Sequence, residues 1–337
     1  MMVISVIVPC RNEARYIDAF LETVFAQRLD GGLYRLEILV ADGRSDDGTR
    51  AKLDNWQQHN PALVVIDNER RIVSTGLNAA IERATGSIIV RMDVHTTYDP
   101  EYVAGCVDAL LATDAACVGG PWRAIGRSER QSAIADAFMS RFGSGGALSR
   151  SVDYTGQVDT VYLGAWRRET LLACGGFDET LIRNQDDELN LRLKRTGGKI
   201  WQSSAIRSYY EPRDSYGSLF RQFHQYGYWK VPVIRKHRVP ASPRQLAPFL
   251  FVSAICVLAF GALASTALQM LFAAVLGTYL AGITAASGLL ANPRRGLRVA
   301  GALICMHFGY GLGFGRGLLD FVVLRRGPHA QAVRLTR

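Results

Sequence analysis

The sequence lacks several patterns that would place it in a familiar functional class. It has no G-x-G-x-x-G after its first predicted strand and no G-x-x-x-x-G-K-[ST] anywhere, which argues against a dinucleotide oxidoreductase and a P-loop nucleotidase. Its six cysteines form no C-x-x-C pair, so we expect buried, reduced thiols rather than a zinc site or a disulfide framework. No nucleic-acid motif accompanies the net charge of +9, which favours an anionic membrane surface as the partner.

Charged residues are also absent from one long stretch near the C-terminus. None occurs in residues 247–292, and a second apolar stretch follows at 299–324 after a short basic break. Stretches of about 20 apolar residues are long enough to cross a membrane. The N-terminal residues 1–9 have no basic region and too short an apolar run for a signal peptide, so a strand is expected there. The sequence therefore predicts a water-soluble part of about 245 residues followed by a membrane-embedded part.

The water-soluble part alternates short apolar strands with helical segments. The predicted strands lie at residues 4–8, 36–40, 63–66, 87–91 and 116–118, and a helical pattern follows each of the first four. Strands and helices that alternate at this spacing predict parallel pairing with right-handed crossovers. The fold class is therefore α/β.

The polar, glycine-rich stretch 121–156 is predicted to be either a mobile loop or a poorly ordered connection.

Two side chains that can bind a metal follow the fourth predicted strand. Asp93 and His95 come directly after the buried run Ser87–Met92, at the sheet edge where ligands bind in open α/β folds. On an extended segment, residues two apart point the same way, so both side chains could face one divalent ion. The alternative is an aspartate that caps the next helix beside a solvated histidine. The pattern alone does not decide between them.

Acidic clusters occur at two further positions. The stretch Asp42–Gly48 follows the second strand and could bind a base or a ribose, or it could be an Asp/Gly-rich turn with a helix cap. The stretch Asp186–Glu188 opens a helix, where acids interact favourably with the helix dipole. Three adjacent acids exceed what capping needs, which makes a catalytic carboxylate a candidate there.

A set of short motifs stands in order over residues 3–230. The motifs are Pro9-Cys10-Arg11-Asn12-Glu13, Asp42-Gly43 with Ser45, Asp47, Gly48 and Thr49, Gly76-Leu77-Asn78, Arg91-Met92-Asp93-Val94-His95, Gly175-Gly176-Phe177-Asp178-Glu179 and Asn184-Gln185-Asp186-Asp187-Glu188-Leu189. Taken together they resemble the inverting family 2 glycosyltransferases of GT-A fold. The Asp-x-His form, with Tyr310-Gly311-Leu312-Gly313-Phe314 in the tail, resembles the branch of that family typified by the succinoglycan glucosyltransferase. The fold this implies is GT-A, a Rossmann-like mixed sheet flanked by helices, followed by interfacial helices and a C-terminal α-helical membrane segment.

The resemblance assigns roles to individual residues. It implies that Asp42 reads the uracil or other base, and that Asp93 and His95 stand where the family holds Mn²⁺ or Mg²⁺ against the diphosphate. Histidine in place of the usual second aspartate favours Mn²⁺, because Mg²⁺ prefers oxygen ligands. The other residues that it assigns to the donor nucleotide sugar are Pro9, Arg11, Glu13 and Asn78.

The general base follows from the register of the last motif. The family usually shows Glu-Asp-x-Asp-Leu, and alignment on Leu189 places Asp186 at the catalytic aspartate. Asp187 is the second candidate for the general base, because the alignment depends on the single residue Leu189. A single carboxylate that takes a proton from an acceptor hydroxyl, opposite a metal-neutralised diphosphate, is the chemistry of an inverting displacement.

The expected domains are a GT-A catalytic domain at 1–213, amphipathic interfacial helices at 214–245, a membrane segment at 246–326 and a basic tail at 327–337. An aromatic stripe on the helix that starts at residue 215 stands beside basic residues, which favours contact with the membrane interface. Two spans, 247–264 and 268–290, are expected to return the chain to its starting side. The glycine-rich third stretch is expected to be re-entrant or closely packed, with the C-terminus cytoplasmic.

The sequence thus predicts a membrane-anchored inverting glycosyltransferase of the bacterial inner membrane with its catalytic domain in the cytoplasm. The expected donor is a UDP-sugar, such as UDP-glucose, and the expected acceptor is a lipid-linked oligosaccharide of exopolysaccharide biosynthesis. A polyprenyl phosphate acceptor is an alternative within the same fold. A nucleotidyltransferase and a non-catalytic membrane scaffold are the rival classes, and the acids at the strand ends argue against the scaffold.

Overall fold

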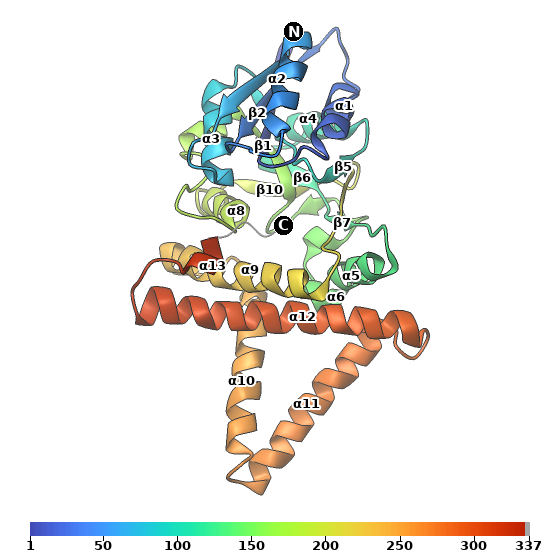
Figure 1. Ribbon diagram of the computed structural model, residues 1–337, viewed down its shortest axis with the longest axis vertical. Helices are drawn as coiled ribbons and strands as arrows, with labels where there is room; N and C mark the ends of the chain where they lie inside the picture. The colour runs from blue at the N-terminus through green and yellow to red at the C-terminus, as the bar shows by residue number, and fades with distance from the viewer. Residues whose placement is uncertain (334–337) are drawn as a thin grey trace. The chain divides into compact units, whose positions relative to one another are not determined.

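The computed structural model of the chain describes residues 1–333, which form two compact units (Figure 1). The sheet unit comprises residues 1–123 and 148–210. The helical unit comprises residues 124–147 and the chain from Glu211 onward.

The sheet unit is built on an eight-stranded mixed sheet. Its first four strands in the sequence pair in parallel, whereas β9 runs antiparallel to both of its neighbours. A second, small sheet has the order β5-β11-β7, with β5 at Thr96–Tyr98, β11 at Ser208–Tyr210 and β7 at Arg123–Ala124. In their spatial order, the strands of the large sheet are β3 (Leu63–Asp67), β2 (Tyr34–Asp42), β1 (Met2–Cys10), β4 (Ile88–Arg91), β9 (Tyr162–Arg167), β6 (Ala115–Gly120), β10 (Lys199–Gln202) and β8 (Gly156–Gln157).

Helices cover the large sheet, and apolar side chains fill the two layers of core between helices and strands. Alternate residues of β1 belong to different layers, with Val6 and Val8 in one and Ile7 in the other, as the two-residue period of a strand requires. The helices of this unit are α1 (Ile17–Phe25), α2 (Thr49–His59), α3 (Val73–Arg83), α4 (Tyr102–Ala112), α7 (Arg168–Ala173) and α8 (Gln185–Arg195), with a short 3-10 turn at Leu148–Arg150. The predicted α/β fold class is confirmed, and the parallel pairing holds for the first four strands.

The stretch predicted as a loop at 121–156 is helical over part of its length. It contains α5 (Glu129–Met139) and α6 (Arg141–Ser144), both in the helical unit. The loop prediction is therefore wrong for this part. Ala133, Ile134, Ala137 and Phe138 follow the helical period and are buried, so the apolar face of α5 outweighs the glycines that follow it.

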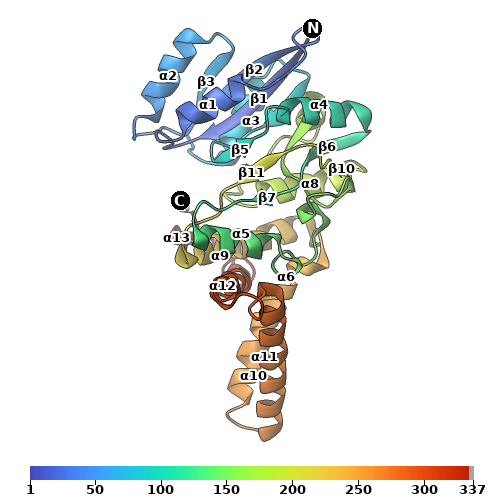
Figure 2. The same ribbon diagram turned by 90° about the vertical axis from the view of Figure 1, so that its right-hand side faces the viewer.

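Two long helices pack together closely in the helical unit: α9 (Tyr216–His237) and α12 (Pro293–Gly317). They run side by side in Figures 1 and 2. A Cβ atom at Gly313 would lie 2.0 Å from the carbonyl oxygen of His224, and one at Gly227 would lie 2.1 Å from that of Tyr310. Only glycine allows the two backbones to approach this closely. The predicted close packing of the glycine-rich stretch is confirmed.

A hairpin of two apolar helices extends away from α12 (Figures 1 and 2). It consists of α10 (Ala247–Gly261) and α11 (Thr266–Ser287), after a 3-10 turn at Pro243–Gln245, and both helices are long and apolar enough to cross a membrane. By length and composition the segment Pro293–Val323 is also a candidate span. It is helical throughout, lies crosswise to the hairpin in both views, and passes from α12 into a π-helical segment, Leu318–Val323. No break turns the chain back within this segment, so of the two alternatives expected for it the structure supports close packing rather than a re-entrant turn.

The aromatic residues of the stripe on α9 are half-buried, and two of them contact other elements of the helical unit. Phe223 lies 5.4 Å from Phe138 of α5, measured between ring centroids, and the Tyr216 hydroxyl donates to the carbonyl of Arg298 (3.0 Å). Phe223 and Tyr216 thus contact other parts of the helical unit, and the interpretation of the stripe as a membrane contact stays a prediction. The last helix described, α13 (Ala330–Val333), is tied to α9 by a hydrogen bond from the Trp229 indole to Ala332 (3.0 Å).

Candidate active site

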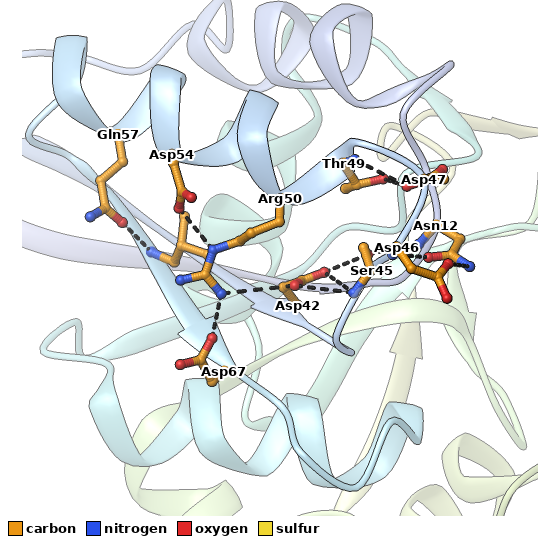
Figure 3. Close-up of polar contacts among 11 residues, drawn as sticks. Asn12, Asp42, Ser45, Asp46, Asp47, Thr49, Arg50, Asp54, Gln57 and Asp67 are labelled. Carbon is orange, nitrogen blue, oxygen red and sulfur yellow. Dashed lines mark hydrogen bonds and ion pairs between the residues drawn. The ribbon is translucent and has the colours of Figure 1, made fainter.

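Asp42 ends β2 as a buried carboxylate in a polar network (Figure 3). It accepts a hydrogen bond from the Ser45 hydroxyl (2.5 Å), and the guanidinium of Arg50 lies 3.9 Å away. Arg50 also pairs with Asp54 (2.8 Å) and Asp67, so its charge is shared among three carboxylates. The network fixes Asp42 at the carboxyl end of its strand, where the sequence predicts a residue that reads the base.

The loops after β1 and β2 are tied to each other by side chains (Figure 3). Asn12 and Asp46 exchange two hydrogen bonds, from the Asn12 amide to the Asp46 carboxylate (2.9 Å) and from the Asp46 backbone to the Asn12 amide oxygen (3.0 Å). The Thr49 hydroxyl accepts from the backbone N–H of Glu13 (2.7 Å) and donates to Asp47 (2.5 Å). Much of the Asp/Gly-rich cluster therefore stabilises the two loops, as the alternative of a turn with a helix cap predicts.

The remaining residues predicted around the nucleotide lie beside these loops. Pro9 pairs with Ala41 at the end of the β1–β2 ladder, and the Arg11 side chain lies 3.2 Å from the position that a Cβ atom of Gly43 would occupy. Burial, together with the nearby acids Glu13, Asp42 and Asp47, raises the pKa of the Cys10 thiol, so it stays protonated. The structure brings Pro9, Arg11 and Asp42 to one end of the strand pair.

The end of β4 carries the main cluster of charges. Arg91, whose side chain is only 5% exposed, donates from Nε and Nη2 to the two oxygens of Asp93 (2.9 and 3.0 Å). Its Nη1 pairs with Asp186 at the start of α8, 95 positions away in the sequence. The side chains of Asp93 and Asp186 keep 32% and 37% of their surface exposed. One buried guanidinium therefore holds two accessible carboxylates at a common site.

The segment that carries Asp93 and His95 is a turn rather than an extended strand. The backbone N–H of Thr96 donates to the carbonyl of Asp93 (3.1 Å), and Tyr98 receives a hydrogen bond from the N–H of Asp93 at its hydroxyl (2.6 Å). His95 Nε2 lies 2.5 Å from a carboxylate oxygen of Glu13. Asp93 and His95 were expected to point the same way because they would lie on an extended segment. That reason is wrong, because the strand β4 ends at Arg91. Within residues 1–333, no three His, Cys, Asp or Glu side chains are arranged to hold a metal by themselves.

Burial and neighbouring charges set the protonation of this cluster. Burial raises the pKa of Asp186, Arg91 opposes this effect, and the negative charges of Asp93 and Asp187 add to it, so the net pKa lies above the ordinary value. Burial lowers the pKa of Arg91, but Asp186 and Asp93 outweigh it and keep the guanidinium charged. Burial also raises the pKa of Tyr98, so its hydroxyl remains neutral.

The three acids that open α8 have different surroundings. Asp186 pairs with Arg91, whereas Glu188 is fully buried and pairs with Arg192 one turn further on (2.7 Å). Arg192 also donates to the carbonyl of Gly176 (2.7 Å), so the Glu188 pair fastens the preceding loop. Asp187 is half-buried. Of the two candidates for the base, Asp186 pairs with Arg91 at the end of β4.

Asn78 has a bracing role in this structure. Its amide nitrogen donates to the carbonyl of Phe177 (2.9 Å) and to Glu179 (3.0 Å), and its oxygen accepts from the N–H of Phe177 (2.8 Å). Gly176 has φ of +66°, and a Cβ atom there would lie 2.5 Å from the Asn78 oxygen. Asn78 thus joins α3 to the Gly-Gly-Phe-Asp-Glu motif, and its assignment to the donor pocket stays a prediction.

Sequence reasoning missed Arg91 and the two tyrosines that support the turn. Tyr162 bonds through its hydroxyl to that of Thr96 (2.7 Å), and Tyr98 bonds to Asp93 as described above. A charged residue inside the apolar run Ile88–Met92 was the available signal for Arg91, because a buried cation needs an anionic partner. Nothing local in the sequence marks the tyrosines.

Comparison with known sequences places this arrangement in context. The sequence profile described as "Glycosyl transferase family 2" matches residues 5–172. The succinoglycan biosynthesis protein ExoA of Rhizobium meliloti is 34% identical over 94% of this chain and 95% of its own length. A dolichyl N-acetyl-α-D-glucosaminyl phosphate diacetamido-dideoxy-glucuronosyltransferase of Methanococcus voltae is 31% identical over 70% of this chain and 75% of its own length.

Solved structures agree with the fold. The mannosyltransferase PcManGT of Pyrobaculum calidifontis, in complex with GDP-Man and Mn²⁺, has a TM-score of 0.62 at 21% identity, over 91% of this chain and 86% of that one. Residues 1–349 of S. aureus TarS, in complex with UDP-GlcNAc, have a TM-score of 0.52 at 17% identity, over 93% and 91%. At these identities the similarity establishes the fold, which is the predicted GT-A type.

Proposed function

The chain belongs to glycosyl transferase family 2 and is a glycosyltransferase, and we propose that it transfers a sugar from a UDP-sugar to a lipid-linked oligosaccharide with inversion. The observation that carries the proposal is the pair of accessible carboxylates, Asp93 and Asp186, held by the buried Arg91. The full-length similarity to ExoA supports exopolysaccharide biosynthesis as the context.

Asp186 is the general base in this proposal. Its pKa is raised by burial, which brings it closer to neutral pH and makes the carboxylate a better proton acceptor. The acceptor hydroxyl loses its proton to Asp186 as its oxygen attacks the anomeric carbon, and the nucleoside diphosphate leaves from the opposite face. Arg91 fixes the direction of the Asp186 carboxylate. One displacement of this kind needs no covalent glycosyl-enzyme.

The residues beside the site fit a divalent metal ion. Asp93 offers a partly exposed carboxylate, and the Glu13 oxygen 2.5 Å from His95 Nε2 is the kind of partner that orients a metal-ligating imidazole. The ligands would be Asp93 and His95, and the bound ion would neutralise the diphosphate of the donor. Since one ligand is an imidazole, we propose Mn²⁺ ahead of Mg²⁺.

The membrane attachment is proposed from the helical unit. The apolar hairpin of α10 and α11 would enter and leave the bilayer, and α12 would stay at the surface because it lies crosswise to the hairpin. Basic residues flank the hairpin on one side, at Arg235–Arg238 and Arg294–Arg298, which supports a cytoplasmic location for that side at a bacterial inner membrane. An acceptor anchored by a polyprenyl group fits this location.

A transfer assay tests the proposal. The purified full chain would be given a panel of radiolabelled nucleotide sugars, Mn²⁺, and extracted lipid-linked oligosaccharides. The expected product is a lengthened lipid-linked oligosaccharide formed from a UDP-sugar. Transfer only to a bare polyprenyl phosphate would favour the alternative acceptor. Release of pyrophosphate with formation of a new nucleotide sugar would show a nucleotidyltransferase, and the absence of donor turnover with every acceptor would favour a scaffold.

A further inference from the structure

The C-terminal end of α9 and the π-helical segment Leu318–Val323 form an open groove of about 250 Å³. Pro232 and Phe321 form its apolar lining, and Arg235 and Lys236 supply two exposed cations. Arg235 donates a hydrogen bond to the backbone carbonyl of Phe321 (2.7 Å), which fixes the position of its guanidinium. The groove therefore combines an apolar surface with a cation whose position is held by the fold.

The floor of the groove is well supported. The Phe321 ring lies 4.9 Å from that of Tyr228 and 6.0 Å from that of Trp229, measured between centroids. Below it, the fully buried Asp320 accepts hydrogen bonds from Arg326 (2.7 and 3.0 Å), Arg316 (3.1 Å) and Tyr228 (3.0 Å). π-Helical segments are rare and are found frequently at functional sites.

The part of the chain that forms the groove is strongly cationic in sequence, and two of its basic residues, Arg235 and Lys236, line the groove. Residues 215–337 contain fourteen of the 39 Lys and Arg residues but only one of the 30 Asp and Glu residues, and that acid is Asp320. Because Asp320 is buried and already bonded by two arginines, it does not neutralise the groove. Two further exposed cations lie close in the sequence to the segments that form the groove: Arg238 just after α9 and Arg325 just after the π-helical segment. The ligand that complements this surface is an anion.

An apolar ridge directly follows the groove. Val322, Val323 and Leu324 are 48%, 69% and 49% exposed, so three consecutive apolar residues are accessible beside the groove. Exposed apolar side chains next to fixed cations match the boundary between acyl chains and headgroups in a bilayer. A soluble anion would have no apolar part to contact the ridge, whereas a lipid has an acyl chain.

We propose that this groove binds an anionic phospholipid, with its phosphate at Arg235 and Lys236 and its acyl chain along Phe321 and the ridge. The proposal rests on the proposed membrane attachment and is independent of the sugar transfer. A bound lipid of this kind would hold the junction of α9 and the π-helical segment at the membrane surface.

Tryptophan quenching tests the site directly. Trp229 packs against Phe321, so it reports on a bromine-labelled acyl chain that enters the groove. The full chain in detergent micelles would be titrated with brominated phosphatidylglycerol and, separately, with brominated phosphatidylcholine. The expected result is saturable quenching by phosphatidylglycerol at a clearly lower mole fraction. The variant Trp229→Phe gives the background from the remaining tryptophans and should lose this signal.

Two charge variants separate a site from general attraction. Lys236→Gln should weaken the apparent affinity for phosphatidylglycerol about 5-fold, the scale of one basic side chain at an anionic surface. Arg235→Lys keeps the charge without the guanidinium geometry and should weaken it less. Arg294→Gln removes one exposed charge from the other end of α12 and should leave the affinity unchanged.

Three results would overturn the proposal: equal loss in Lys236→Gln and Arg294→Gln, equal quenching by the two lipids, or displacement of the lipid by inorganic phosphate at comparable concentration. The first indicates diffuse attraction, the second an apolar surface, and the third a site for soluble anions. Because quenching reads lipid binding and not turnover, a failure here leaves the proposed transferase function standing. Failure of the transfer assay likewise leaves this readout intact.

Discussion

Replacing Arg91 by methionine removes the cation that holds Asp93 and Asp186 together. Methionine keeps much of the apolar volume of the arginine stem but donates no hydrogen bond. Three donated bonds are lost, two to Asp93 and one to Asp186, and two carboxylates are left facing each other beside a buried cavity. We expect Arg91→Met to fold less stably and to bind a divalent cation at the vacated position more tightly.

The magnitude follows from the exposure of the groups. Removing one partner of a buried ion pair costs about 3–5 kcal/mol. Here Arg91 is 5% exposed but the two carboxylates are 32% and 37% exposed, so water recovers part of their lost stabilisation. We therefore expect a loss of about 2–3 kcal/mol, which for a unit of this size lowers Tm by roughly 4–12 °C. The variant Arg91→Lys keeps the positive charge but lacks the planar guanidinium that bonds both carboxylates. It should therefore be more stable than Arg91→Met and less stable than the wild type.

Thermal unfolding of the purified chain, followed by circular dichroism with EDTA and with Mn²⁺, measures both effects. Mn²⁺ should raise the Tm of Arg91→Met by more than it raises that of the wild type. Arg44→Met is the matched control, because the Arg44–Glu69 pair (2.7 Å) is 54% and 75% exposed and is expected to contribute under about 1 kcal/mol. An Arg91→Met variant as stable as Arg44→Met, or one that gains nothing extra from Mn²⁺, would refute the reasoning.

Five further outcomes are expected. Asp93→Asn should abolish Mn²⁺-dependent binding of the nucleotide sugar in calorimetry while the far-UV spectrum stays native; wild-type affinity would remove Asp93 from the metal site. Asp186→Asn should bind donor normally and lower turnover at least about 100-fold, whereas the same pattern in Asp187→Asn would shift the register by one. Because a base works only when deprotonated and the pKa of Asp186 is raised, kcat/KM should fall on acidification at a pH above the ordinary aspartate value of about 3.9, and a fall at or below that value would contradict this. Gly313→Ala should destabilise the α9–α12 pair by about 1–3 kcal/mol in denaturant unfolding, while Gly315→Ala, whose Cβ would meet only the edge of a ring at 3.4 Å, should be tolerated. A single cysteine appended to the C-terminus of a cysteine-free variant should react with an impermeant reagent only after spheroplasts are permeabilised, and earlier labelling would show a third crossing.

The sequence by itself determined the features that depend on local pattern. Short β-branched runs followed by helical periods defined the α/β class, because strand and helix periods are properties of neighbouring residues. The charge-free stretch 247–292 defined the apolar hairpin for the same reason, since the length of a span is counted along the chain. The ordered motifs identified the family, and the comparisons confirm it.

Only the tertiary structure decided which of these residues meet. Arg91 bonds to both Asp93 and Asp186, and its contact with Asp186 spans 95 positions, a separation at which no local signal encodes a contact. The turn at 93–96 is held by Tyr98 and is not visible as a pattern, so the extended geometry expected there was wrong.

The course of α12 shows the same limit in the helical unit. Its composition fits a membrane span equally well, but its glycines pack on the α9 backbone and it lies crosswise to the hairpin. Hydropathy measures how apolar a helix is, whereas its direction is set by the helices against which its small residues pack.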